Sequence, residues 1–198
     1  MESPFPEHAL PRVWKWIEAF RWRVADDFGP KTLDEFVQHV GREPLTWGVF
    51  RGDELGGLVT ARPLSPVTVE SAYLFKREFW GSEATAEGLR TVYAELFAKG
   101  YERIFGLVFA DNAQLLGLMK RMGFEREGRL RAHTRRNGKP VDLIVAGLLK
   151  GDFEHVGIAG GIERPGGRAG EHGGGADGHI HVVEQRIDDD AQPPGIAA

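Results

Sequence analysis

The stretch that decides the fold is VTVESAYLFKREFWGSEAT, residues 67–85. Residues 67–76 are β-prone and predict a long strand, and apolar positions across residues 84–99 recur at helical spacing. Gly81 and Ser82 lie at the junction, where glycine permits a tight turn and serine can cap the helix. Exposed amides in the first turn of such a helix can bind an anionic diphosphate, although many capped helices bind no ligand.

Further elements are predicted on both sides of this junction. Thr32 and Glu35 form a capping-box pattern that starts a helix ending at Gly41. Asn137-Gly138 is a strong hairpin signal, because both turn positions tolerate a positive φ. The expected elements are helices at residues 11–22, 33–40 and 113–122, a hairpin of residues 46–50 and 55–62, a strand at 104–109, and a closing antiparallel pair at 126–135 and 140–149. This order predicts an α/β (α+β) fold in one domain over residues 1–154.

The composition changes near residue 155. From there the sequence is rich in glycine and poor in large apolar side chains, so residues 155–198 are predicted to form a mostly disordered tail. Within it, residues 179–183 alternate like a short strand, and His179 and His181 with His172 could bind a metal ion weakly. A solvated tail with incidental histidines is favoured, so no metal site is expected.

The net charge and the cysteine content argue against several classes of function. The formal net charge is −4 and the pI about 6.0, so the chain lacks the broad cationic surface that attracts nucleic acid or anionic membranes. The absence of cysteine excludes a thiolate nucleophile and disulfides. The first residues do not resemble a secretory signal, and no apolar run is long enough to span a membrane. We therefore expect a cytoplasmic protein, monomeric or homodimeric, that binds neither nucleic acid nor membrane.

The order of short motifs resembles the GNAT (N-acetyltransferase) superfamily, and within it the ribosomal-protein alanine acetyltransferase branch. The motifs are Trp80-Gly81 before a helix, Asp111-Asn112 after the next strand, Met122-Gly123-Phe124 after the following helix, and Glu127-Gly128 leading to the Asn137-Gly138 hairpin and Asp142. The resemblance implies a mixed, mostly antiparallel sheet flanked by helices. Its two parallel strands, residues 67–76 and 104–109, would splay apart to admit acetyl-CoA.

The resemblance also implies the residues that bind acetyl-CoA as co-substrate. The diphosphate would rest on the loop of Trp80, Gly81, Ser82, Glu83, Ala84 and Thr85, preceded by Phe75, Lys76 and Arg77, and Asn112 would contact the pantetheine arm. Asn112 can equally be a helix cap. The implied function is direct transfer of acetyl to a primary amine of a small molecule or a protein.

Three positions depart from the family pattern. Glu78 replaces the usual Gln or Arg, and Glu83 replaces a small residue. A carboxylate about 4 Å from a phosphate would cost roughly 1 to 4 kcal/mol, unless it points to solvent. Met119 replaces a tyrosine that protonates the departing thiolate. These departures motivate an alternative, a catalytically reduced GNAT-fold binding or assembly protein of the phage type, which the sequence around the loop also resembles.

Catalysis needs a base and a proton donor. Glu70 is a candidate base acting through water, with a plain surface position on the strand as the alternative, and Tyr73 is a candidate proton donor. His133 could contact the acceptor, and the arginines of the hairpin, Arg129, Arg131, Arg135 and Arg136, could attract an acidic partner, although incidental surface positions are favoured for both. The identity of the acceptor does not follow from the sequence.

Overall fold

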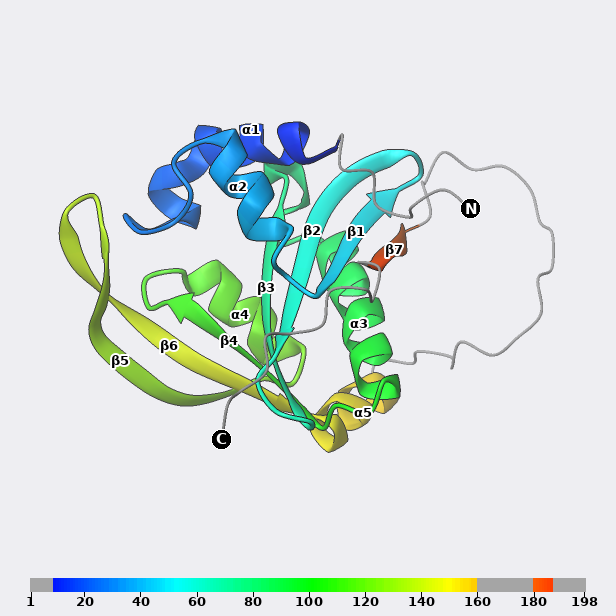
Figure 1. Ribbon diagram of the computed structural model, residues 1–198. Helices are drawn as coiled ribbons and strands as arrows, with labels where there is room; N and C mark the ends of the chain where they lie inside the picture. Colours follow the sequence, from blue (N-terminus) through cyan, green and yellow to red (C-terminus); the bar gives the residue numbers. More distant parts are fainter. Residues whose placement is uncertain (1–8, 160–179, 187–198) are drawn as a thin grey trace, which may run out of the picture.

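A computed structural model describes residues 9–159 and 180–186 (Figure 1). The helices are α1 (Leu10–Val24), α2 (Leu33–Val40), α3 (Glu83–Ala98), α4 (Ala113–Arg121) and α5 (Lys150–Ala159), with a short 3₁₀ helix η2 (Arg77–Phe79). The strands are β1 (Leu45–Arg51), β2 (Glu54–Pro63), β3 (Thr68–Phe75), β4 (Arg103–Phe109), β5 (Glu125–Arg136), β6 (Lys139–Leu149) and β7 (Ile180–Arg186). The elements predicted from the sequence between residues 11 and 149 are all present, with boundaries shifted by a few residues.

The strands form one sheet in the order β5-β6-β4-β3-β2-β1-β7. Only β3 and β4 are parallel, and their pairing is limited to Thr68–Arg103, Val69–Ile104 and Glu70–Phe105. Both strands continue beyond these pairs, to Phe75 and Phe109. The two central strands therefore diverge, which confirms the predicted mixed sheet with a splayed parallel pair.

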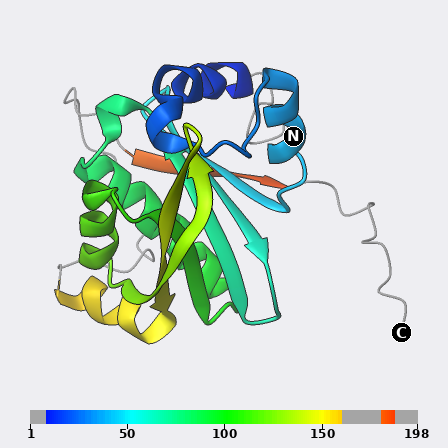
Figure 2. The same ribbon diagram turned by 90° about the vertical axis from the view of Figure 1, so that its left-hand side faces the viewer.

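Helices cover both faces of this sheet (Figures 1 and 2). On one face, α3 buries Leu89, Val92 and Leu96 against β1, β3 and β4, and α4 and α5 extend the same core. On the other face, α1 and α2 bury Val13, Trp14 and Phe36 against β2 in a second, smaller core. This places the N-terminal helices on the face of the sheet opposite α3.

The C-terminal end of α1 is bent. Phe20 has non-helical angles, φ −131° and ψ 24°, inside the helix. Its ring meets the indole of Trp80 edge-on, with centroids 5.2 Å apart. The bend thus brings the last turn of α1 to the loop that precedes α3.

The closing hairpin of β5 and β6 has the predicted turn, in which Asn137 (φ 53°) and Gly138 (φ 73°) both lie in the left-handed region. The register of β5 shifts between Leu130 and Thr134, and Ala132 also has a positive φ of 48°. The carboxylate of Asp142 holds this irregular segment, since it accepts a hydrogen bond from the Ala132 amide at 2.7 Å. The bulge bends the hairpin toward the N-terminal helices (Figure 2).

The tail predicted for residues 155–198 differs from the structure in two segments. Helix α5 continues to Ala159, and β7 pairs antiparallel with β1 from Leu45–Arg186 to Arg51–Ile180. The predicted alternation of apolar residues lets β7 place one face on the core while its backbone completes the edge of β1. The remainder of the predicted tail, with His172 and His179, lies outside the described residues. Among those described, no helix is long and apolar enough to cross a membrane.

Candidate functional site

A cavity of about 290 Å³ opens where β3 and β4 diverge. It is bounded by the second half of both strands, by the start of α3 and by the first two turns of α4. Seven of the predicted site residues line it: Glu70, Tyr73, Phe75, Trp80, Gly81, Thr85 and Asn112. Lys76, Arg77, Ser82, Glu83 and Ala84 are not part of its lining.

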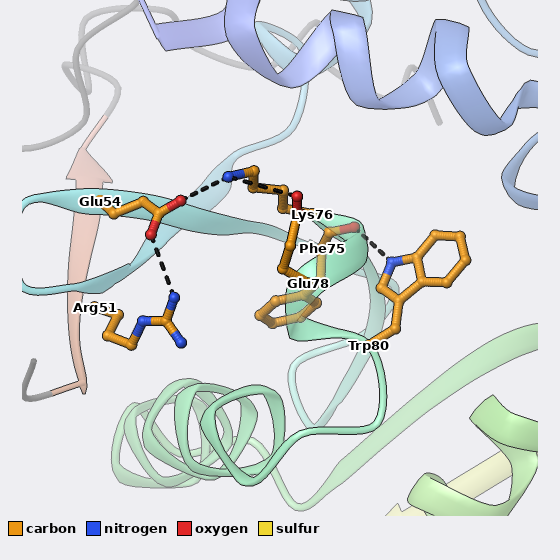
Figure 3. A network of polar contacts seen from close by, with 6 residues as sticks. All are labelled: Arg51, Glu54, Phe75, Lys76, Glu78 and Trp80. Carbon is orange, nitrogen blue, oxygen red and sulfur yellow. Dashed lines mark hydrogen bonds and ion pairs between the residues drawn. The ribbon is translucent and has the colours of Figure 1, made fainter. Parts of the chain in front are cut away.

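The loop between β3 and α3 is held in one conformation by local hydrogen bonds. The indole NH of Trp80 donates to the carbonyl of Phe75 at 2.7 Å, as Figure 3 shows. Gly81 has φ +70°, and a Cβ there would lie 2.8 Å from Nε2 of Gln114. Ser82 caps α3 by accepting the amide of Thr85 at 3.3 Å. Glycine is therefore needed for both the backbone angle and the close approach of α4.

The amides of this loop divide into two groups. Those of Trp80 and Ser82 are bonded to the carbonyls of Arg77 and Phe79. The amides of Gly81, Glu83 and Ala84 have no hydrogen-bond partner among the described residues. The amides of Trp80 and Ser82 thus bond within the turn, while Gly81 and the first turn of α3 keep donors that have no partner among the described residues.

The acidic residues near the loop are paired with cations. Nζ of Lys76 lies 2.7 Å from Glu54 and 3.9 Å from Glu78 (Figure 3). The bond from Lys76 lowers the pKa of Glu54, and the same bond raises the pKa of Lys76. Lys76 therefore points toward β2 and away from the cavity.

Glu83 does not obstruct the cavity. Its carboxylate lies 2.5 Å from the guanidinium of Arg90, and its side chain is 78% exposed. Exposure and pairing screen its charge, so the repulsion of a phosphate falls to the low end of the expected range, about 1 kcal/mol. Although Glu83 departs from the family pattern, its side chain therefore leaves the amides of Gly81 and the first turn of α3 accessible.

Two arginines lie at the aromatic pair of Phe20 and Trp80. The guanidinium of Arg23 is 5.5 Å from the centroid of the Trp80 ring, and that of Arg77 is 5.3 Å from the centroid of Phe20. Arg23 lines the cavity. No carboxylate of the described residues pairs with either guanidinium. Arg23 therefore brings a positive charge to the cavity beside Trp80.

The predicted base and proton donor lie on opposite faces of β3. Tyr73 packs with Phe75 against the core under α3, whereas Glu70 is in register with Arg62 of β2 on the face of α1 and α2. Both reach the cavity because it passes between the diverging strands. Burial raises the pKa of Tyr73 well above its usual value. Its hydroxyl is therefore protonated at neutral pH.

Asn112 caps a helix, which is one of the two roles that the sequence allowed. Its Oδ1 caps α4 by accepting the amide of Leu115 at 3.2 Å, and the residue also lines the cavity. Met119 lines the same wall and is buried. No group of His, Asp or Glu that could hold a metal ion occurs among the described residues.

Three polar residues that line the cavity were not predicted from the sequence: Arg23, Ser71 and Gln114. Ser71 is 6% exposed, and its hydroxyl has no hydrogen-bond partner in the described part of the chain. Gln114 follows Asn112 in the first turn of α4, so its position after the Asp-Asn motif was a usable signal. Arg23 has no such signal, because the bend at Phe20 brings it to the cavity.

Comparison with solved structures identifies the fold. RimJ from Mycobacterium smegmatis in complex with CoA-disulfide aligns with a TM-score of 0.67 at 14% identity, over 80% of this chain and 87% of that one. A RimL ribosomal L7/L12 α-N-protein acetyltransferase in complex with coenzyme A aligns with a TM-score of 0.65 at 16% identity, over 74% and 92%. The fold is that of these acetyltransferases.

Comparison of the sequence with protein-family models identifies the family. The model of the acetyltransferase (GNAT) domain matches residues 5–125, so this chain belongs to the GNAT acetyltransferase family. The uncharacterized N-acetyltransferase YoaA of Bacillus subtilis (strain 168) is 33% identical over 111 residues, which are 54% of this chain and 63% of that protein. The chain thus matches less than two thirds of the length of this relative.

Proposed function

We propose that this protein is an N-acetyltransferase that transfers the acetyl group of acetyl-CoA to a primary amine. The observation that carries the proposal is the cavity between β3 and β4, which is lined by Gly81 and Arg23. Among the described residues, the amide of Gly81 has no hydrogen-bond partner and the guanidinium of Arg23 has no carboxylate partner. An anionic coenzyme with a long, narrow arm fits such a cavity.

The residues of this chain fit acetyl-CoA in two ways. The amides of Gly81, Glu83 and Ala84 would donate to the diphosphate, and Arg23 would add a positive charge beside Trp80. The backbone of β4 beyond Phe105 has no β3 partner, so it would offer hydrogen bonds to the amides of the pantetheine arm.

The reaction asks for proton transfers and orientation. The neutral amine nitrogen forms a bond to the acetyl carbon as the carbon–sulfur bond breaks, and coenzyme A leaves as a thiolate. In this proposal Tyr73, which lines the cavity, donates a proton to the thiolate, because Met119 cannot serve. Glu70, on the face of the acceptor, takes the proton of the amine through water.

Titration calorimetry with acetyl-CoA tests the proposal, followed by release of free thiol in the presence of amines. We expect one binding site per chain, and binding that is lost in Gly81→Asp, which places a carboxylate beside the free amides. Absence of heat and of a thermal shift at millimolar acetyl-CoA would refute the function. The alternative, a catalytically reduced binding protein, is less favoured, because Glu83 is paired with Arg90 outside the cavity.

A further inference from the structure

A second cavity, of about 430 Å³, lies on the face of the sheet covered by α1 and α2. Its walls come from these helices, from the loop between them, from β2 and from Leu143 of β6. Its volume is in the range of pockets that hold small organic molecules.

The two cavities meet between the diverging strands. Six residues line both: Val24, Ala72, Tyr73, Leu74, Leu107 and Phe109. Five of the six belong to the parts of β3 and β4 that no longer pair with each other beyond Glu70 and Phe105. The sixth is Val24 of α1. The two cavities are therefore adjacent, and a molecule in the second one lies next to these shared side chains of the first.

The second cavity has little capacity to bind polar groups. Its only ionisable side chains, apart from Tyr73, are Asp26 and His39. Oδ1 of Asp26 accepts the amides of Phe28 and Gly29, and Oδ2 accepts the hydroxyl of Thr134 at 2.6 Å. Asp26 is thus committed to the loop, and the remaining walls are almost entirely apolar.

The loop that carries Asp26 is also bonded to the tip of the β5–β6 hairpin. The carboxylate of Asp27 accepts the amides of Asn137 and Gly138 at 2.9 and 2.8 Å, and its own amide donates to the carbonyl of Arg135 at 2.8 Å. Together with the bond from Thr134 to Asp26, these contacts tie the loop to the hairpin. The loop is one wall of the cavity, and the volume of the cavity suits a small molecule.

We infer that the acceptor is a small primary amine with an apolar body, an alkylamine or arylalkylamine that is held in this second cavity with its nitrogen toward the gap between β3 and β4. This inference rests on the proposed acetyltransferase function and adds the class of acceptor. Binding depends on burial of the apolar body, since no unpaired carboxylate lines the cavity to hold a second ammonium group.

The test is the acetylation rate of a homologous series, propylamine to hexylamine, measured by thiol release. Each buried methylene should raise kcat/KM about threefold to fourfold, so hexylamine should exceed propylamine by roughly thirtyfold or more. Phenethylamine should also exceed ethanolamine, spermidine and a peptide with a free N-terminus. Ligand-observed NMR without acetyl-CoA should show contact with hexylamine and none with ethanolamine.

Two matched variants test whether the second cavity causes the dependence of kcat/KM on amine chain length. Leu107 is 40% exposed and lines both cavities, whereas Leu149 is 49% exposed and lines neither. Leu107→Asn should flatten the dependence on chain length, and Leu149→Asn should leave it unchanged.

The outcomes separate this inference from the function on which it rests. Tight binding of acetyl-CoA with a flat amine series, or with preference for the polyamine or the peptide, overturns the acceptor class alone. Failure to bind acetyl-CoA overturns both.

Discussion

Replacement of Gly81 by alanine tests whether the loop before α3 binds acetyl-CoA. Gly81 has φ +70°, and a residue with a side chain in this region costs about 1–2 kcal/mol. For a chain of this size the cost corresponds to a loss of roughly 2–8 °C in Tm. The new Cβ would lie 2.8 Å from Nε2 of Gln114, which is the end of a flexible side chain and can move.

The same substitution should weaken acetyl-CoA binding. A shift of the loop would remove a hydrogen bond between the Gly81 amide and the coenzyme, and a bond to a charged group contributes about 1.5–3 kcal/mol. We therefore expect a Kd about tenfold to a hundredfold higher by calorimetry.

Gly52→Ala provides the control. Gly52 has φ +55° in the β1–β2 turn, and a Cβ there would have no neighbour within 4 Å. This variant should lose a similar amount of Tm and keep the Kd for acetyl-CoA. If Gly81→Ala binds acetyl-CoA as tightly as the unchanged protein, or if both variants weaken it equally, the assignment of the loop is wrong.

Three further predictions concern single side chains. Tyr73→Phe should lower kcat by about 10²–10⁴-fold if Tyr73 is the proton donor, with the Kd for acetyl-CoA unchanged. Ser82→Ala removes the cap of α3 and should cost about 1 kcal/mol in urea unfolding. The Ala132 amide and Arg129 lower the pKa of Asp142, so Asp142 stabilises the fold above its unfolded pKa of about 3.9. This contribution is lost as the pH falls through the lower folded pKa, and the difference in unfolding free energy from Asp142→Asn should disappear there.

Much of the fold could be predicted because local signals and tertiary packing agree. The apolar spacing in residues 84–99, the cap at Ser82 and the Asn137-Gly138 turn each specify one conformation, and the structure has all three. The pairing of β7 with β1 was not predicted, since a short alternating run in a glycine-rich context carries no information about its partner strand.

Residues of the candidate site could be predicted only where their positions depend on the neighbouring sequence. Gly81 and Asn112 follow from their positions at helix starts, and both line the cavity. The direction of a long side chain does not follow from position, because it depends on partners distant in sequence. Lys76 turns to Glu54, and Arg23 reaches Trp80 only because α1 bends.

Strand β7 has a consequence for biosynthesis. The edge of β1 is covered by a segment that leaves the ribosome more than a hundred residues after β1 itself. Until β7 has been synthesised, the nascent sheet carries an open edge that other chains can pair with. Expression of a shortened gene that stops after α5 should therefore yield protein that self-associates, even though every element around the cavity is already encoded.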